Sequence, residues 1–478
     1  MCLTVRNFEY LKCYFIALVF IPILEFTIEY EVHTRGVTLI DMKQGTRARH
    51  SSGSTIKISL LTLCNQSSFI SSAFYWFITV ITGLAVISTG NTYYQNDRAA
   101  HWLRIEQLRA GVIIPQLSQD NPGLVVGNLD GNVVQFNNTA VNSPLAYLPS
   151  VIFRGDFLST SIFTLFFTAT IIALAIFIAK DFRYAILATA LLPMTFFSLT
   201  FPTADAMINS TSLLFIACVL RFYQSEKITW LRIVCLTILA AILGQVKITC
   251  VLVSFFVLVL IRHAQKLSMK LSLSLPILIS IVSMRSWYSL VSNIAGAPQK
   301  VTLEQSAELM TQIKLDPLGL LKSWLRTLFE PISVDAETID GIKVNARRNL
   351  QIFTGTETVQ LATAVIVPIL IAIAIITIVG ASERRISGWK EITVPILISC
   401  AYFAATCTAM LVTWAGTSSG YASGIQNRYF IPIMPLLLLL IPKIFHGTIH
   451  QKIYRLTVAS LVIFTYVGIT ISFVITWA

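Results

Sequence analysis

The sequence predicts an all-α polytopic integral membrane protein with about eleven transmembrane helices and two long loops on one side of the membrane. Of its 478 residues, 55% are hydrophobic and only 12% are charged, which is more apolar surface than a water-soluble globule can hide. Apolar runs of the length that crosses a bilayer recur along the chain, about 20 residues each. Lys and Arg gather in alternate short loops, as the positive-inside rule requires.

The chain divides into an N-terminal extension, residues 1–68, and a transmembrane domain, residues 69–478. The extension has an apolar run from Cys13 to Phe26, but Glu25 and Glu29 interrupt or follow it and no small-residue cleavage site is evident, so its topology stays undecided. The predicted spans are 69–90, 160–179, 184–201, 206–221, 228–244, 247–262, 271–290, 357–380, 392–413, 429–446 and 456–477.

The positive charges orient these spans. One set of alternate loops holds most of the cations, and we place it in the cytoplasm. It comprises Lys180, Arg183, Arg221, Lys227, Arg262, Lys266, Lys270, Arg384, Arg385, Lys390, Lys443, Lys452 and Arg455. The two long loops, residues 91–159 and 291–356, then face the exoplasmic side, where we expect the function to reside. Mixed charges in the second loop are typical of a solvated surface.

Several functional classes are disfavoured. The net charge of +12 is spread over short loops and forms no basic stripe of the kind that binds nucleic acid. The eight cysteines include no C-x-x-C pair, so neither a zinc site nor a disulfide framework is predicted. The sequence also has no phosphate-binding Gly-rich loop, no G-x-S-x-G elbow and no H-E-x-x-H motif.

The first long loop is predicted to contain an amphipathic helix over residues 97–110, ended by Gly111. Trp102, Ile105 and Leu108 form its apolar edge, and we expect the helix to lie along the membrane surface. Residues 124–126 and 133–136 flank an Asp-Gly pair, which predicts a short β-hairpin.

Asp97 is the first candidate catalytic residue. It lies just after the first span, where its carboxylate is placed to take a proton from an incoming hydroxyl as a general base. The alternative is that Asn96 or Asp97 only caps the helix. His101 and Arg104 follow at i+4 and i+7 and share a helix face with Asp97, although a surface histidine is as readily a bystander.

A second set of candidates lies in the short turns and span ends of the same side. Asp205 follows Phe201-Pro202-Thr203-Ala204 and is either a functional carboxylate or a helix N-cap. Lys247, Arg285 and Arg428 lie at exoplasmic span ends, against the charge bias, which favours a phosphate partner. Snorkelling to lipid headgroups is the alternative.

These residues resemble a family of polytopic bacterial membrane proteins catalogued as domain of unknown function 2142 and grouped with the GT-C glycosyltransferases. The family pattern Pro-Asp-Glu, two residues, His, an aromatic residue and Arg is matched at Asp97, His101 and Arg104, while Asn96 and Arg98 depart from it. Further similar segments are Ser143-Pro144-Leu145-Ala146-Tyr147-Leu148-Pro149, Leu192-Pro193-Met194 with Asp205, Ala206 and Asn209, Lys247, and Gly424-Ile425-Gln426-Asn427-Arg428-Tyr429-Phe430-Ile431-Pro432. The resemblance covers about residues 70–445.

The resemblance implies a GT-C-like fold in the bacterial cytoplasmic (inner) membrane, with the active face exoplasmic. It implies an enzyme that transfers a sugar from a polyprenyl-phosphate donor to a cell-envelope glycan or lipid acceptor. Asp97 and His101 would be catalytic. The residues that would bind substrate are Arg104, Asp205, Lys247, Arg285, Gln426, Arg428 and Tyr429. We predict no cofactor and assign no metal. A transporter or flippase of lipid-linked glycan and a noncatalytic envelope-assembly partner remain alternatives, the latter because Arg98 replaces an acid.

Overall fold

In the computed structural model, residues 67–90, 97–119, 124–129, 131–225, 228–295, 303–329, 338–339, 342–343, 361–380, 388–415, 420–422, 425–441 and 451–477 are described. The chain forms two compact units, Met1–Ser71 and Ser72–Ala478. Nearly all of the first unit, and with it the question of how residues 1–66 are placed, lies outside the described residues. The fold described below is that of the second unit.

The described chain is dominated by apolar α-helices. Six helical stretches are long and apolar enough to cross a membrane, namely Ser67–Ser88, Phe157–Ala190, Ala204–Tyr223, Leu267–Leu290, Glu391–Trp414 and Lys452–Ile475, and three shorter apolar stretches are Trp230–Val246, Ile248–His263 and Ala364–Ile378. The prediction of a helical multi-pass membrane protein is therefore confirmed. The count of eleven spans is not.

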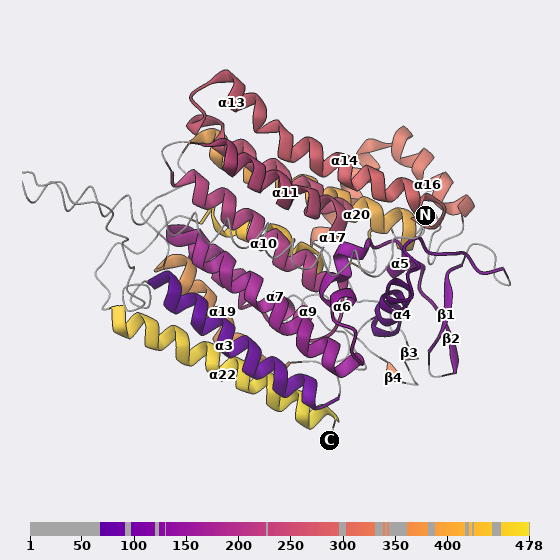
Figure 1. The fold of residues 1–478 in the computed structure, drawn as a ribbon, viewed down its shortest axis with the longest axis horizontal. Helices are drawn as coiled ribbons and strands as arrows, with labels where there is room; N and C mark the ends of the chain where they lie inside the picture. The colour runs from indigo at the N-terminus through magenta and orange to yellow at the C-terminus, as the bar shows by residue number, and fades with distance from the viewer. Residues whose placement is uncertain are drawn as a thin grey trace, which may run out of the picture. The chain divides into compact units, whose positions relative to one another are not determined.

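The long helices pack side by side (Figure 1). α3 (Ser67–Ser88), α7 (Phe157–Ala179), α10 (Ala204–Tyr223), α11 (Trp230–Val246) and α14 (Ser274–Leu290) follow one another across the bundle. α19 (Thr363–Ile378) packs on α22 (Gln451–Trp477), and α20 (Trp389–Met410) packs on η5 (Phe255–His263). Contacts of Ser72 and Trp76 with Ala173 and Thr170 join α3 to α7.

α10 lies at the centre of the bundle, and 94% of its most apolar stretch is buried inside the protein. Its polar side chains are satisfied inside the bundle: Ser210 donates to the carbonyl of Ala206 at 2.7 Å, and Asn209 donates to Ser198 at 2.9 Å. A buried polar side chain is tolerated when it is hydrogen-bonded in this way. The first residues of α10 are thereby held rigidly at one end of the bundle.

Three of the predicted spans are interrupted. Residues 184–201 form α8 (Arg183–Ala190) and α9 (Pro193–Leu199), which pack back on α7 after the 3₁₀ turn η3 (Lys180–Phe182). Residues 247–262 form η4 (Ile248–Cys250), α12 (Val251–Ser254) and η5, and residues 429–446 begin with η7 (Asn427–Ile433) and α21 (Met434–Leu438). Pro193, Pro432 and Pro435 each remove a backbone donor, which explains two of the three interruptions.

The first long loop folds into a compact layer over the bundle. Its elements are α4 (Arg98–Arg109), β1 (Val126–Leu129), β2 (Asn132–Gln135), α5 (Asn137–Ala140), η2 (Pro144–Tyr147) and α6 (Leu148–Ile152). The predicted helix and hairpin are both confirmed. β1 and β2 pair antiparallel with Gly127 opposite Val134, and Gly131 supplies the positive φ of 82° that the turn needs.

α4 is buried by protein along most of its surface. Its predicted apolar edge is in the interior, since Trp102, Ile105 and Leu108 are each less than 9% exposed. This edge faces protein, because the hairpin and α6 cover the helix, and the placement of the helix along the membrane surface stays a prediction. Leu103 packs in a small cluster with Val125, Phe136, Ala140 and Ile294.

The second long loop contributes α15 (Ser292–Ala295), α16 (Leu303–Leu315), α17 (Pro317–Phe329) and a two-residue pairing of β3 (Thr338–Ile339) with β4 (Ile342–Lys343). α16 and α17 pack against α20 and the π-helical turn η6 (Leu411–Ala415) that follows it. The short helix α13 (Leu267–Ser272) precedes α14.

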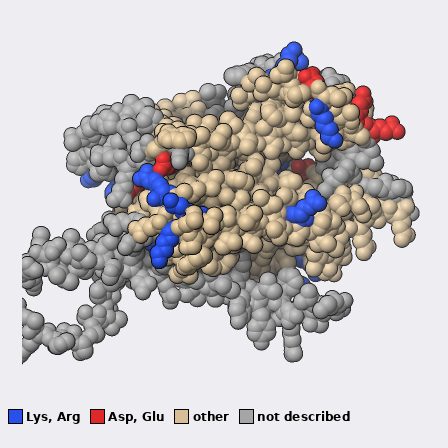
Figure 2. Space-filling view, turned by 90° about the horizontal axis from the view of Figure 1, so that it is seen from above, with Lys and Arg blue, Asp and Glu red and all other residues tan. Residues whose placement is uncertain are grey.

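The bundle has two chemically different ends. At one end, which we call the site end, α7 and α10 begin and α14 ends. There Trp287 of α14 donates to the carbonyl of Val141 in the loop layer at 2.7 Å. At the basic end, α7 is followed by Lys180, and α10 and η5 end near Arg221 and Arg262. Lys and Arg form separate groups on a largely uncharged surface in the face shown in Figure 2, without a continuous basic patch there.

Candidate functional site

Arg428 is the centre of a charged cluster at the site end. It lies in the first turn of η7, and its side chain is only 8% exposed. Its Nε is 3.3 Å from Oδ2 of Asp205, and its Nη2 is 3.8 Å from Oδ2 of Asp97. Three segments that are far apart in the sequence thus bring two carboxylates to one guanidinium.

Asp97 combines a strained backbone with an exposed carboxylate. Its φ of 56° and ψ of 15° are left-handed, a conformation that is uncommon outside glycine and costs about 1 kcal/mol or more. Its carbonyl accepts the first helical bond of α4, from His101 N at 2.8 Å. Its side chain makes no capping hydrogen bond and is 44% exposed beside Arg428. Asp97 occupies the cap position, but its carboxylate is directed to the cluster.

Asp205 lies in the first turn of α10 and is not the cap of that helix. Thr203 is the cap, and its hydroxyl accepts from the backbone N–H of Asp205 at 3.3 Å. The carboxylate of Asp205 is 15% exposed and faces Arg428. A carboxylate at a helix N-terminus is also favoured by the helix dipole.

His101 is buried below the cluster, and both of its ring nitrogens are engaged. Nδ1 lies 2.7 Å from the hydroxyl of Tyr147, and Nε2 lies 3.1 Å from that of Thr203. Asn142 donates to the Tyr147 hydroxyl at 3.2 Å. One arrangement of protons satisfies this series of hydrogen bonds: the Tyr147 hydroxyl donates to Nδ1, and the Nε2–H donates to the Thr203 hydroxyl.

The charge state of His101 follows from its burial. Burial lowers the pKa of His101 from 6.5 to about 4, although Asp97 and Asp205 act in the opposite direction and Arg428 adds to the lowering. Burial also raises the pKa of the Tyr147 phenol. The imidazole is therefore neutral at pH 7, and it links α4 to η2 and α10. This geometry shows His101 as a link between these elements, and its catalytic role stays a prediction.

Lys247 and Tyr429 extend the cluster. Lys247 separates α11 from η4 with an extended backbone, φ −162° and ψ 137°. Its Nζ lies 4.4 Å from the centroid of the Tyr429 ring, and the Arg428 guanidinium lies 5.8 Å from the same ring. Gln426 begins η7, since its carbonyl accepts from Tyr429 N at 3.1 Å. Lys247, Arg428 and Tyr429 are thus brought together, as their predicted role requires.

Arg104 is placed differently from its predicted role. It is fully buried, and its guanidinium donates to the carbonyls of Ile113 at 2.8 Å, Asn142 at 3.3 Å and Val112 at 3.4 Å. Burial lowers the pKa of Arg104 to about 10, so it remains charged at pH 7. These bonds fold the loop after α4, and none of them reaches the charged cluster.

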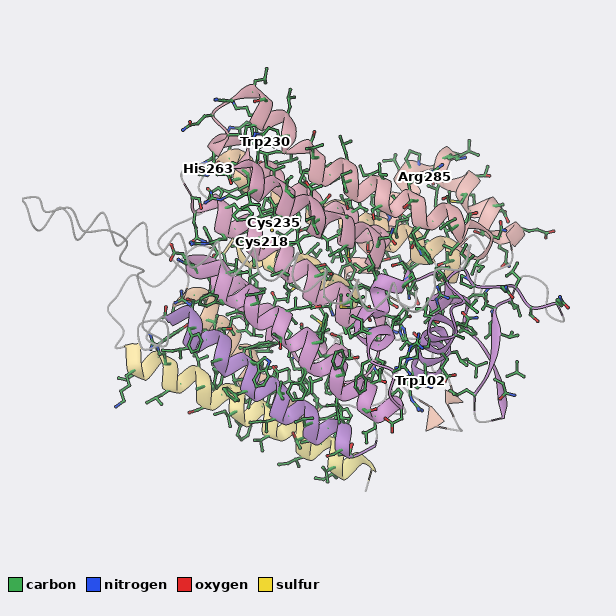
Figure 3. All side chains as sticks on the ribbon, viewed as in Figure 1. Trp102, Cys218, Trp230, Cys235, His263 and Arg285 are labelled. Carbon is green, nitrogen blue, oxygen red and sulfur yellow. The ribbon has the colours of Figure 1, made fainter. Side chains whose placement is uncertain are left out.

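Arg285 also lies apart from the cluster. Its side chain is exposed on α14, and its position is labelled in Figure 3. Among the described residues, it forms no ion pair with Asp97 or Asp205. The snorkelling alternative fits this placement.

Sequence reasoning did not assign roles to Tyr147 and Thr203, which hold His101. Thr203 carried a usable signal, because a threonine just before an apolar helix is a preferred N-cap. Arg98, which replaces the expected acid, is buried with its guanidinium 4.1 Å from the centroid of the Phe157 ring. Among the described residues, no group of three or more His, Cys, Asp and Glu side chains is arranged to hold a metal ion.

The apolar bundle and the charged cluster at one of its ends define a multi-pass membrane protein. The chain belongs to the family described as "Predicted membrane protein (DUF2142)", whose profile matches residues 128–437. This range contains Asp205, Lys247 and Arg428, whereas Asp97 and His101 precede it. No curated protein and no solved structure matches the chain.

Proposed function

We propose that the protein is a GT-C-type glycosyltransferase that moves a sugar from a polyprenyl-phosphate donor to a cell-envelope acceptor at the site end of the bundle. The observation that carries this proposal is the convergence of Asp97, Asp205 and Arg428. A partly exposed carboxylate, held by a buried guanidinium at the end of a helix bundle, suits proton abstraction from a hydroxyl group next to a lipid surface.

The proposed reaction is a single inverting displacement. Asp97 takes the proton from the acceptor hydroxyl, and the oxygen of that hydroxyl bonds to the anomeric carbon of the donor sugar. The bond between that carbon and the phosphate oxygen breaks, and its electron pair leaves with the polyprenyl phosphate. Lys247 and Arg428, which both lie close to the Tyr429 ring, would stabilise the charge that develops on the leaving phosphate.

Asp205 and His101 have supporting roles in this proposal. Asp205 fixes the Arg428 guanidinium through the 3.3 Å contact, so that Arg428 is preorganised before substrate binds. His101 fixes the start of α4, and therefore Asp97, relative to α10. Arg104 acts on the loop conformation and not on substrate.

The distribution of charge supports an enzyme over a transporter. Within the described membrane-crossing helices, ionised side chains lie within about two turns of a helix end, and α7 contains none. A carrier is expected to place ionisable residues near the middle of its spans. The cations of the basic end favour a cytoplasmic location for that end, and the site end would then be exoplasmic in the bacterial cytoplasmic membrane.

The test is turnover of the full chain in lipid vesicles with a panel of polyprenyl-phosphate sugars. We expect Asp97→Asn to lower turnover by about 100-fold or more, the usual contribution of a general base. Glu106→Gln is the matched control, since Glu106 is exposed on the same helix and lies outside the cluster; it should keep full activity. Equal turnover of Asp97→Asn and Glu106→Gln would remove Asp97 from the reaction.

A further inference from the structure

α17 carries a row of leucines that no described part of the protein covers. Leu318, Leu321, Leu325 and Leu328 are 75%, 45%, 49% and 54% exposed. At 100° per residue they fall within about 80° of one another around the helix. The row therefore forms one continuous apolar strip along the length of α17.

The face of α17 that adjoins this strip is packed against protein. Leu320 and Trp324 join the cluster of Leu309, Cys407, Leu411, Ala422 and Ile425. Trp324 Nε1 donates to Thr408 of α20 at 3.1 Å, and Thr327 accepts from Ala422 N at 2.9 Å. α17 is consequently fixed beside the end of α20, a helix long enough to cross a membrane.

Two exposed cations border the leucine strip. Lys322 and Arg326 lie about 40° and 80° beyond Leu318 around the helix, on the side away from Leu320 and Trp324. The Arg326 guanidinium also lies 6.0 Å from the centroid of the Tyr421 ring. The order around α17 is thus protein contact, apolar strip and cations. That order is typical of helices that lie in the plane of a membrane interface, with the apolar strip at the acyl boundary and the cations among headgroup phosphates.

We propose that α17 is an interfacial helix that binds the surface of the lipid leaflet at the site end, with a preference for anionic headgroups. The occupant is lipid because the helix is fixed at the end of a membrane-crossing helix, which places the strip at bilayer depth, and because Lys322 and Arg326 complement anionic phosphates. The inference stands independently of the proposed sugar transfer.

The experiment is photo-crosslinking of the full chain in vesicles of equal phosphatidylglycerol and phosphatidylcholine. p-Benzoylphenylalanine replaces Leu325, and after irradiation mass spectrometry identifies the adduct. We expect a lipid adduct enriched in phosphatidylglycerol. The matched position is Glu304, exposed on α16, which should give little lipid adduct. Lys322→Gln in the crosslinking chain should lower the phosphatidylglycerol enrichment by up to about fivefold, whereas Lys314→Gln should leave it unchanged.

Two outcomes would overturn the proposal. A crosslink from Leu325 to a second copy of the chain would show that the strip is a protein interface. A lipid yield no higher than that of Glu304 would show that the strip is not in contact with the bilayer. Neither readout depends on catalytic turnover, so failure here is distinguishable from failure of the proposed enzyme activity.

Discussion

The two carboxylates that face Arg428 should contribute very differently to stability. Asp205 is 15% exposed and lies 3.3 Å from Nε, whereas Asp97 is 44% exposed and lies 3.8 Å from Nη2. Removing one partner of a fully buried ion pair costs 3–5 kcal/mol, roughly, because the other charge is left uncompensated. Asp97 remains as partial compensation, so we expect Asp205→Asn to cost about 2–3 kcal/mol of unfolding free energy.

Asp97→Asn should be far milder. An ion pair with this much solvent exposure contributes about 0.2–1 kcal/mol, and asparagine accepts the left-handed backbone of this position, so no new strain arises. Asp97→Asn should therefore separate catalysis from folding, since it loses turnover while its stability stays within about 1 kcal/mol.

Thermal unfolding of the full chain in detergent measures the order of stability of these variants. The double variant Asp205→Asn/Arg428→Met should recover part of the loss, because replacing both members of a buried pair is less costly than orphaning one. The reasoning is refuted if Asp97→Asn lowers the unfolding midpoint as much as Asp205→Asn does, or if the losses in the double variant simply add.

Three further predictions concern the surroundings of the cluster. The pKa of His101 is lowered from 6.5 to about 4, so below pH 6.5 the unfolded chain binds the proton first; up to about 3 kcal/mol of stability is lost as pH falls from 6.5 toward 4, and His101→Gln should flatten this dependence in unfolding midpoints. Arg104→Lys should lower the free energy of unfolding by about 2–3 kcal/mol, and with it the unfolding midpoint, because hydrogen bonds to loop carbonyls are lost. It should leave KM unchanged at a permissive temperature. A Cβ at Gly244 would clash with the carbonyl oxygen of Ser280, so Gly244→Ala should cost about 1–3 kcal/mol by forcing α11 from α14; an unchanged midpoint would contradict this packing.

The sequence was sufficient for the class of protein and for the local elements of the first loop. Apolar runs predicted membrane helices, Gly111 predicted the end of α4, and the Asp-Gly pair predicted the turn of the hairpin. All of these features depend on interactions between near neighbours in the sequence. The interruptions of the predicted spans were harder to place. Pro193 was visible, but whether a proline ends a helix or only bends it depends on the neighbours that satisfy the freed carbonyl groups.

The candidate site shows the same division. Sequence alone determined which ionisable residues stand out against the apolar background, including Asp97, Asp205, Lys247 and Arg428. Only the tertiary structure decided that Arg428 lies between two carboxylates, while Arg104 binds loop carbonyls and Arg285 points outward. The physical reason is that burial and pairing of a charge are set by segments distant in sequence, whereas its presence near a span end is a local property of the chain.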